Sequence, residues 1–232
     1  MADKVTSIIL HYKRPDNISR WMEGIKHQTV ESEIIVWDQS GEYREGSGED
    51  VLIKSNKNFH CLPRVLCGGL ASHEWIWNQD DDMAINDKFL FEKLIEEGSK
   101  YPDHVIGWNG RDLSLCNNWD KPYWQPEGGF IDAVDSIREG LKVDLINFGV
   151  SFYKKNLINE LAINPFEKFG ITKDEYKYAD DIIASRQWKN KRTVDFLMKS
   201  LDRLDEGEAL SKQSGHMPAR DKWTINLFKG KV

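Results

Sequence analysis

The sequence has few cysteines and no long hydrophobic run. Cys61, Cys67 and Cys116 are odd in number and form no Cys-x-x-Cys pair, which argues against a disulfide framework and against a structural zinc site. The longest apolar runs, residues 8–10 and 34–37, are far shorter than the roughly 18 residues needed to cross a bilayer. Because the N-terminus also lacks an export signal, we expect a soluble, cytoplasmic protein without a transmembrane segment.

The chain also lacks an excess of positive charge. Its 32 basic and 38 acidic residues give a net charge of -6, so a general electrostatic attraction to nucleic acid or to an anionic membrane is not expected. Any bound phosphate must then be met by a few local cations or by a metal ion. Apolar material is plentiful, because 40% of the 232 residues are hydrophobic, enough for a sizeable core. Nine tryptophans offer flat faces that suit such a core, or sugars and bases.

Segments of strand type alternate with helical ones along the first hundred residues. Short β-branched and aliphatic runs predict strands at residues 5–11, 33–38, 51–55, 74–78 and 104–108. Apolar side chains at helical spacing predict helices at residues 16–27, 61–72 and 89–98. This alternation is typical of an α/β fold with a mixed, mostly parallel sheet flanked by helices.

The second half of the chain is less regular. Residues 109–129 carry tryptophans, prolines and glycines without a clean period, which indicates an irregular, aromatic-lined excursion. Strand character resumes over residues 143–153, broken by Asn147-Phe148-Gly149, and residues 156–161 and 181–188 have helical character. The polar tail from Asp205 onward is expected to be partly loop. With no internal repeat, a single domain is the simplest interpretation.

Polar residues follow several of the predicted strands. Ligands of an open parallel sheet bind beyond the carboxyl ends of its strands, because loops and helix N-termini converge there. Those ends carry Tyr12-Lys13-Arg14, Asp38 and Asp80-Asp81-Asp82. Three consecutive carboxylates repel one another unless a cation lies among them, and Mg²⁺ or Mn²⁺ with substrate phosphates suits such oxygen ligands. The alternative is a solvated acidic turn, since Asp is common in turns.

This pattern resembles the nucleotide-sugar-dependent glycosyltransferases of the GT-A fold, whose hallmark is an Asp-any-Asp motif at the place of Asp80-Asp81-Asp82. The resemblance covers residues 5–187 and extends to family-2-type and exostosin-type enzymes, including capsid-glycan enzymes of large algal viruses. It implies a single Rossmann-like GT-A domain over residues 1–232, with a nucleotide-binding half (1–108) and an acceptor-binding half with a C-terminal tail (109–232). It further implies a hexosyltransferase assisted by Mn²⁺ or Mg²⁺, with a UDP-sugar as the favoured donor and a glycan or glycoconjugate as acceptor.

The resemblance also assigns donor and metal residues. Asp38 would accept a hydrogen bond from the nucleotide base, Arg64 would neutralise diphosphate, and Gly149 would let the backbone approach the donor hexose. The full nucleotide-sugar set is Tyr12, Arg14, Asp38, Arg64, Asp80, Asp81, Gly149 and Lys222. The implied metal ligands are Asp82, Asp80 and His216, with Arg220 or Lys222 offsetting the charge of the leaving group. Each has a plainer alternative: a turn-forming Asp38, a surface Arg64 and a solvated His216.

Two carboxylates late in the chain are candidates for catalysis. In the family that the sequence resembles, an acidic residue at the start of a late helix acts as the general base, and Asp181, with Asp180 as its neighbour and acceptor ligand, matches that place. A sugar hydroxyl is a poor nucleophile until a base begins to remove its proton. The alternative is that both residues only stabilise the helix dipole.

Aromatic residues of the irregular excursion are candidates for acceptor binding. Trp119, Tyr123 and Trp124 would stack on a sugar face, unless they belong to the core.

Two other functions compete with sugar transfer. A nucleotidyltransferase acting on sugar phosphates is disfavoured because residues 11–16 contain no glycine to let the backbone surround a triphosphate. A non-catalytic carbohydrate-binding domain does not explain carboxylates at the ends of parallel strands.

Overall fold

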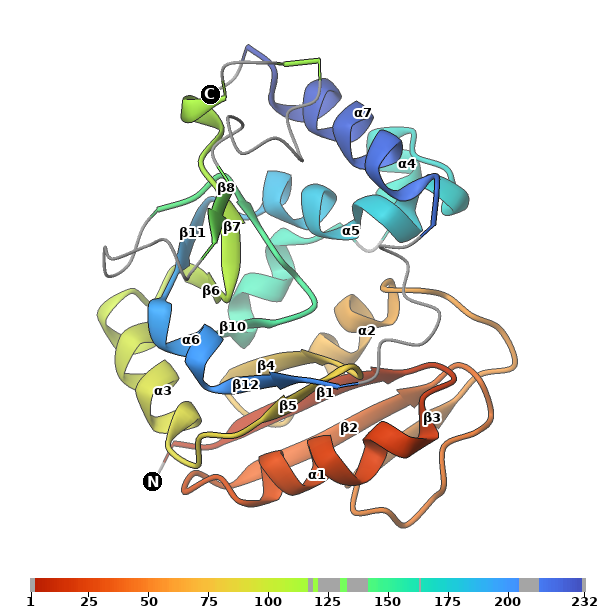
Figure 1. The fold of residues 1–232 in the computed structure, drawn as a ribbon, viewed down its shortest axis with the longest axis vertical. Coiled ribbons are helices and arrows are strands. Elements are labelled where there is room, and N and C mark those ends of the chain that lie inside the picture. The colour runs from red at the N-terminus through yellow and green to blue at the C-terminus, as the bar shows by residue number, and fades with distance from the viewer. Residues whose placement is uncertain are drawn as a thin grey trace.

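A computed structural model describes residues 3–116, 119–120, 130–132, 142–162, 164–204 and 213–230. At its centre is a seven-stranded sheet with the order β11-β6-β10-β4-β1-β2-β3 (Figure 1). β10 runs antiparallel to both of its neighbours, and the other pairings are parallel. The strands are β1 (Val5–His11), β2 (Ser32–Asp38), β3 (Val51–Lys54), β4 (Trp75–Asp80), β6 (His104–Gly107), β10 (Ser151–Lys154) and β11 (Asn190–Thr193). The predicted α/β fold with a mostly parallel sheet flanked by helices is confirmed.

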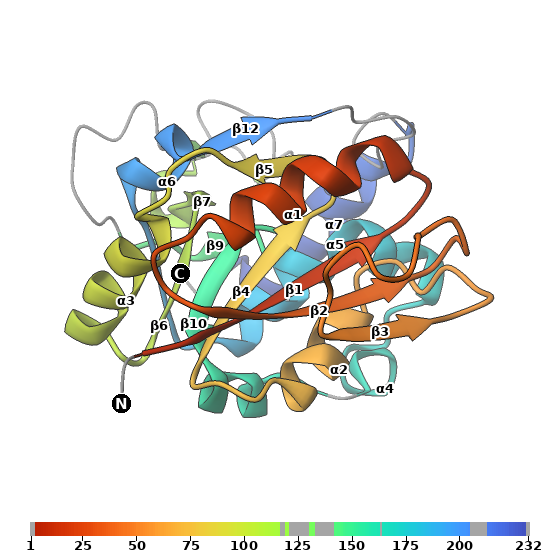
Figure 2. The same cartoon turned by 90° about the horizontal axis from the view of Figure 1, so that it is seen from below.

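Helices cover both faces of this sheet, which explains why its central strands β1 and β4 are buried almost throughout. α1 (Ile18–Lys26) and α3 (Leu90–Lys100) pack on one face, where Ile9 of β1 joins their core. α2 (Pro63–Leu70) and α5 (Lys173–Gln187) pack on the other face, against Ile8. Figure 2 shows α1 and α2 on opposite sides of the sheet.

The remaining elements extend this core. A second small sheet pairs β5 (Met83–Ile85) with β12 (Leu201–Arg203), and a third joins β8 (Phe130–Asp132), β7 (Asn109–Arg111) and β9 (Leu145–Ile146). The other α-helices are α4 (Pro165–Phe169), α6 (Asp195–Lys199) and α7 (His216–Phe228). Short 3-10 helices lie at Pro15–Asn17, Leu113–Leu115 and Lys155–Glu160. No helix in the described ranges is long and apolar enough to cross a membrane.

The structure differs from the sequence-based expectation mainly near the C-terminus. The helix expected at residues 181–188 begins at Lys173, where Thr172 and Glu175 form a capping box. The tail expected to be partly loop contains α7, whose Trp223 and Phe228 pack with Ile182 of α5 in a separate apolar cluster. That burial stabilises α7, although no strong helical pattern marks it in the sequence.

Candidate active site

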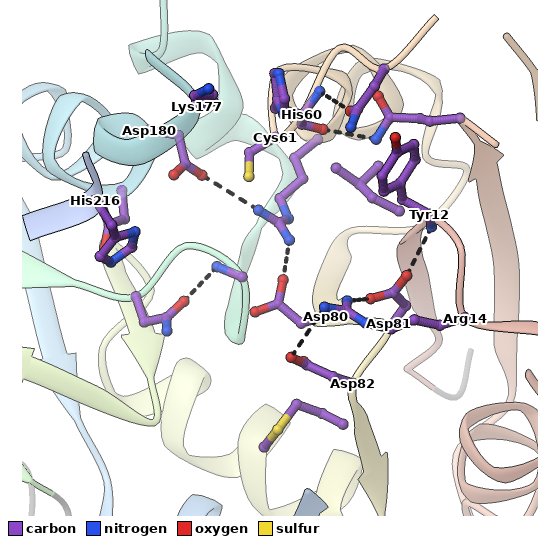
Figure 3. Close-up of a pocket in the computed structure, with 18 of the residues that line it drawn as sticks. Tyr12, Arg14, His60, Cys61, Asp80, Asp81, Asp82, Lys177, Asp180 and His216 are labelled. Atoms are coloured by element: carbon purple, nitrogen blue, oxygen red, sulfur yellow. Dashed lines mark hydrogen bonds and ion pairs between the residues drawn. The ribbon is translucent and has the colours of Figure 1, made fainter. Parts of the chain in front are cut away.

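A cavity of about 490 Å³ opens at the carboxyl ends of β1 and β4 and extends to α2, α5 and α7. This volume falls within the roughly 300–1,000 Å³ of typical small-molecule sites. Figure 3 shows Asp80, Asp81 and Asp82 on one side of it and Asp180, Lys177 and His216 on another. Residues far apart in the sequence therefore line one cavity.

Asp81 fixes the loop that follows β1. Its carboxylate accepts a hydrogen bond from the main-chain N–H of Tyr12, 2.8 Å away, and forms an ion pair with Arg14. Its main-chain oxygen accepts a hydrogen bond from the Asn17 side chain at 3.1 Å. Asp81 is 3% exposed, so its main role in this arrangement is to hold Tyr12 and Arg14 at the cavity wall.

Arg64 of α2 joins the two acidic groups. Its guanidinium pairs with Asp80 at the end of β4 and lies 3.4 Å from a carboxylate oxygen of Asp180 in α5. It is buried beside the Phe148 ring, 5.8 Å from its centroid. Arg64 thus lies inside the cavity, where its charge is held by two carboxylates from different halves of the chain.

Gly149 lies directly against Asp80. A Cβ atom at position 149 would overlap both carboxylate oxygens of Asp80. The main-chain N–H of Gly149 donates to Asn147 Oδ1 at 2.7 Å, which fixes the turn that leads into β10. A glycine is therefore required for the backbone to approach this carboxylate.

Asp82 is the carboxylate of the triplet with the least cationic compensation. Nη2 of Arg14 lies 3.9 Å from its carboxylate. Burial and the negative charge of Asp80 raise the pKa of Asp82 to about 7. A cation bound here would relieve that unfavourable charge.

Asp80 and Asp82 offer carboxylate oxygens, the ligands that a divalent metal such as Mg²⁺ or Mn²⁺ prefers. No three His, Cys, Asp or Glu side chains in the described ranges come together as a metal-holding group. Mg²⁺ and Mn²⁺ commonly take one or two carboxylates from the protein and the remaining ligands from substrate phosphates and water. Asp82 and Asp80 fit that arrangement, in which the metal arrives with a diphosphate.

His216 lies elsewhere. It is the first residue of α7 and its ring contacts that of Tyr178, with centroids 5.8 Å apart. Figure 3 shows it on the Asp180 side of the cavity, away from Asp82. Burial and the positive charge of Arg220 lower the pKa of His216 to about 4, so it is neutral at pH 7. The structure does not bring His216 together with the other two expected metal ligands.

Helix α5 is interrupted at the point where its two carboxylates begin. Ala179 has non-helical dihedral angles, φ -127° and ψ 15°, and Asp180 and Asp181 follow it. The Asp181 carboxylate forms an ion pair with Arg220 of α7 and accepts a hydrogen bond from the Ile182 N–H at 2.8 Å. The break lets both carboxylates line the cavity.

Asp180 has a different environment from Asp181. Burial and the negative charge of Asp181 raise its pKa to about 6, against the opposing charge of Arg64. A carboxyl with a pKa near 6 is mostly ionised at neutral pH and still basic enough to accept a proton. Asp180 therefore has the properties expected of a general base.

Other residues expected in the site lie outside the cavity wall. Asp38 is fully buried, and its carboxylate accepts hydrogen bonds from the N–H groups of Ser40, Gly41 and Tyr43 and contacts His11 Nδ1 at 3.1 Å. These contacts organise the loop after β2.

Two further expectations concern Lys222 and the aromatic excursion. Lys222 is about half exposed and pairs with Glu175, whereas Arg220, two residues earlier, lines the cavity. Trp119 packs against the apolar cluster of α5 and α7. Tyr123 and Trp124 lie outside the described residues.

The cavity also contains residues that the sequence analysis did not select, among them His60 and Lys177. Lys177 precedes Asp180 by three positions in the sequence, and both line the cavity although the break at Ala179 lies between them. Its nearness to the acidic pair in the sequence is the signal that could have selected Lys177. His60 carries none in the sequence, since its φ of +54° is set by contacts made only in the fold.

Solved structures with a similar fold include a glycosyltransferase, and the expected mixed α/β architecture with a mostly parallel sheet is confirmed. No family model and no curated protein matches the sequence. Among solved structures, TarS of S. aureus matches with a TM-score of 0.53 and 15% identity, over 82% of this chain and 35% of TarS. The mannosyltransferase PcManGT from Pyrobaculum calidifontis, in complex with GDP-Man and Mn²⁺, matches with a TM-score of 0.49 and 13% identity, over 81% of this chain and 51% of that one. The chain thus spans about half the length of the mannosyltransferase and about a third of TarS.

Proposed function

We propose that the protein is a glycosyltransferase that moves a sugar from a nucleoside diphosphate donor to a hydroxyl group of a carbohydrate acceptor. The observation that carries this proposal is Arg64, which connects Asp80 at the sheet edge with Asp180 at the break of α5 inside one cavity. Sugar transfer needs both sides. One side must stabilise a departing diphosphate, and the other must take the proton of the attacking hydroxyl.

The donor side carries the charges that a diphosphate leaving group requires. Arg14, Arg64 and Arg220 line the cavity, and each guanidinium presents several N–H donors to phosphate oxygens. When the donor binds, these arginines exchange part of their contact with protein carboxylates for contact with phosphate. Asp82 and Asp80 would hold Mn²⁺ or Mg²⁺, which neutralises developing negative charge on the diphosphate.

The acceptor side carries the base. We assign general-base catalysis to Asp180, because both oxygens of Asp181 are already engaged by Arg220 and by the Ile182 N–H. Asp181 then raises the pKa of Asp180, which makes Asp180 a stronger base, and holds the helix break in place. This exchanges the roles of the two residues expected from sequence, and it applies to a transfer that inverts the anomeric configuration.

The nucleobase of the sugar donor is a separate question. The sequence favoured uridine. The resemblance implied both a UDP-sugar donor and a contact of its base with Asp38, but the Asp38 carboxylate is used by the loop after β2. Tyr12, at the end of β1, lines the cavity instead. UDP and GDP are therefore both tested as probes.

Calorimetric titration of UDP and GDP tests the proposal. With Mn²⁺ present, at least one nucleotide is expected to bind in the micromolar range, and EDTA or Asp82→Ala should weaken its affinity at least tenfold, about 1.4 kcal/mol. Lys13→Ala, at an exposed position next to the site, is the control and should retain affinity. Absence of binding by both nucleotides, together with no hydrolysis of any UDP- or GDP-sugar in a panel, would contradict the proposed function.

A further inference from the structure

Two basic side chains line the cavity away from the diphosphate groups. Lys177 extends from α5 and His60 from the loop before α2. Figure 3 shows both on the side opposite Asp81 and Asp82, where Asp180 also lies. They belong neither to the arginines assigned to the leaving group nor to the carboxylates assigned to metal and base.

Lys177 has no ion pair with any residue in the part of the chain that the structure describes. Its ammonium group lies over the ring of Tyr178, with Nζ 4.6 Å from the centroid. The cavity arginines Arg14, Arg64 and Arg220 all pair with aspartates. A half-buried ammonium group without such a partner leaves a local positive potential directed at the cavity.

Three hydrogen bonds fix the backbone around His60, in the loop before α2. Gln39 donates through Nε2 to the main-chain oxygen of His60 at 2.9 Å and accepts at Oε1 from the Phe59 N–H at 2.6 Å. The His60 N–H donates to Asn58 Oδ1 at 2.7 Å. These bonds hold His60 at a φ of +54°, a conformation that residues other than glycine adopt only when their surroundings impose it.

Lys177 and His60 interact electrostatically. Burial and the positive charge of Lys177 lower the pKa of His60, and the negative charge of Asp174 opposes the shift. His60 is therefore neutral at pH 7 and offers a ring N–H as hydrogen-bond donor beside a fixed positive charge. An ammonium group and an imidazole N–H together suit a small oxyanion.

The place of this pair identifies which substrate brings the anion. Lys177 and Asp180, the assigned base, line the same side of the cavity (Figure 3), so a ligand on Lys177 is next to the hydroxyl that loses its proton. The diphosphate end, marked by Arg14 and Asp82, is across the cavity. An anion bound by Lys177 therefore belongs to the acceptor.

We propose that the acceptor carries an anionic group, a phosphate or a carboxylate, and that Lys177 and His60 bind it. This inference rests on the proposed function and deepens it, because it names the chemical class of the acceptor. A neutral sugar would leave the ammonium group without a partner. When the acceptor has an anionic group near its reactive hydroxyl, binding of that group by Lys177 and His60 orients the hydroxyl.

Binding of simple sugars tests this inference without knowledge of the natural acceptor. The full chain is saturated with UDP or GDP and Mn²⁺, whichever nucleotide binds, so that phosphate probes cannot enter the diphosphate end. Glucose, glucose 6-phosphate and glucuronic acid are then titrated by calorimetry or ligand-observed NMR. We expect at least one anionic sugar to bind about tenfold more tightly than glucose, and the better of the two identifies phosphate or carboxylate.

Variants of α5 give the matched comparison. Lys177→Gln should abolish the preference for the anionic sugar, and His60→Gln should reduce it. Lys173→Gln removes an exposed lysine one turn earlier on the same helix and should leave the preference unchanged. Nucleotide affinity and circular dichroism spectra should be unaltered in all three.

Several results would overturn the inference. These are equal binding of all three sugars by the wild-type protein, an unchanged preference in Lys177→Gln, or loss of nucleotide affinity in Lys177→Gln, which would put Lys177 in the donor site. Failure of the proposed function has a different signature, because the nucleotide itself would then not bind.

Discussion

Arg220 donates a hydrogen bond to the main-chain oxygen of Tyr178, 2.8 Å away, at the place where helix α5 is interrupted. The same guanidinium pairs with the Asp181 carboxylate. A broken helix leaves carbonyl groups without their usual N–H partners, and buried carbonyls require replacements. A single side chain of α7 therefore satisfies the break in α5 and neutralises one of the two carboxylates that follow it.

The pairing of Arg220 with Asp181 predicts strong coupling between them. Arg220→Gln should lower the free energy of unfolding by about 3–5 kcal/mol, because it leaves a buried carboxylate without its partner. The double variant Arg220→Gln/Asp181→Asn should recover a large part of that loss. Urea unfolding of the two single variants and the double variant measures the coupling, and losses that simply add would show that the pair is not coupled.

The assignment of Asp180 as base predicts unequal effects of two neighbouring substitutions. Asp180→Asn should lower turnover by roughly 100-fold or more, the usual range for loss of acid–base catalysis, while nucleotide affinity stays within about twofold. Asp181→Asn should reduce stability more than turnover. Initial rates with the best donor of the panel, alongside thermal unfolding, separate the two. The reverse ranking of turnover would return the role of base to Asp181.

The raised pKa of Asp82 predicts how stability changes with pH. A carboxyl that titrates near 7 in the folded chain and near 3.8 when unfolded binds more protons in the folded state between those pH values. Its contribution to the free energy of unfolding therefore falls as pH rises from about 4 to about 7. The wild type should lose stability relative to Asp82→Asn over that window, as measured by urea unfolding at several pH values without metal. A constant difference between the two proteins would mean that the pKa of Asp82 is ordinary.

The contact between Gly149 and Asp80 predicts that position 149 tolerates no side chain. Gly149→Ala should displace the Asp80 carboxylate, weaken nucleotide binding and destabilise the fold by about 1–3 kcal/mol, as overpacking does. Gly69→Ala is the matched control, since a Cβ there meets nothing within 4 Å and alanine favours the helix by about 1 kcal/mol. Thermal unfolding and nucleotide titration of both variants provide the measurement. Normal nucleotide affinity in Gly149→Ala would argue that Asp80 does not take part in donor binding.

The parts of the fold that were predictable depend on local pattern. Strands β1 and β4 are short apolar runs buried on both faces, and the carboxylates that follow β4 lie at the sheet edge as the parallel topology requires. The alternation of strands and helices in the first hundred residues was enough to place them.

The parts that were not predictable depend on contacts between distant residues. The break at Ala179 is stabilised by Arg220, some forty positions later, and nothing near Ala179 in the sequence marks it. Asp38 has the residue type and strand-end position of a base-binding group, yet its carboxylate is taken by the loop that follows. Local pattern identifies which polar residues reach the sheet edge, and only the fold decides which of them face the cavity.

The antiparallel strand β10 has a consequence for how the chain is made. β10 lies between β4 and β6, although it is synthesised after both. While the ribosome adds the intervening residues, which takes roughly 4–15 s at about 5–20 residues per second, β4 has an open hydrogen-bonding edge and β6 has no partner strand. An apolar nascent chain with such an edge is a natural client of chaperones that shield unpaired strands. The arrival of β10 joins β4 to β6 and, in the same event, carries Gly149 to Asp80, so this side of the cavity forms before α5 and α7 supply the other side.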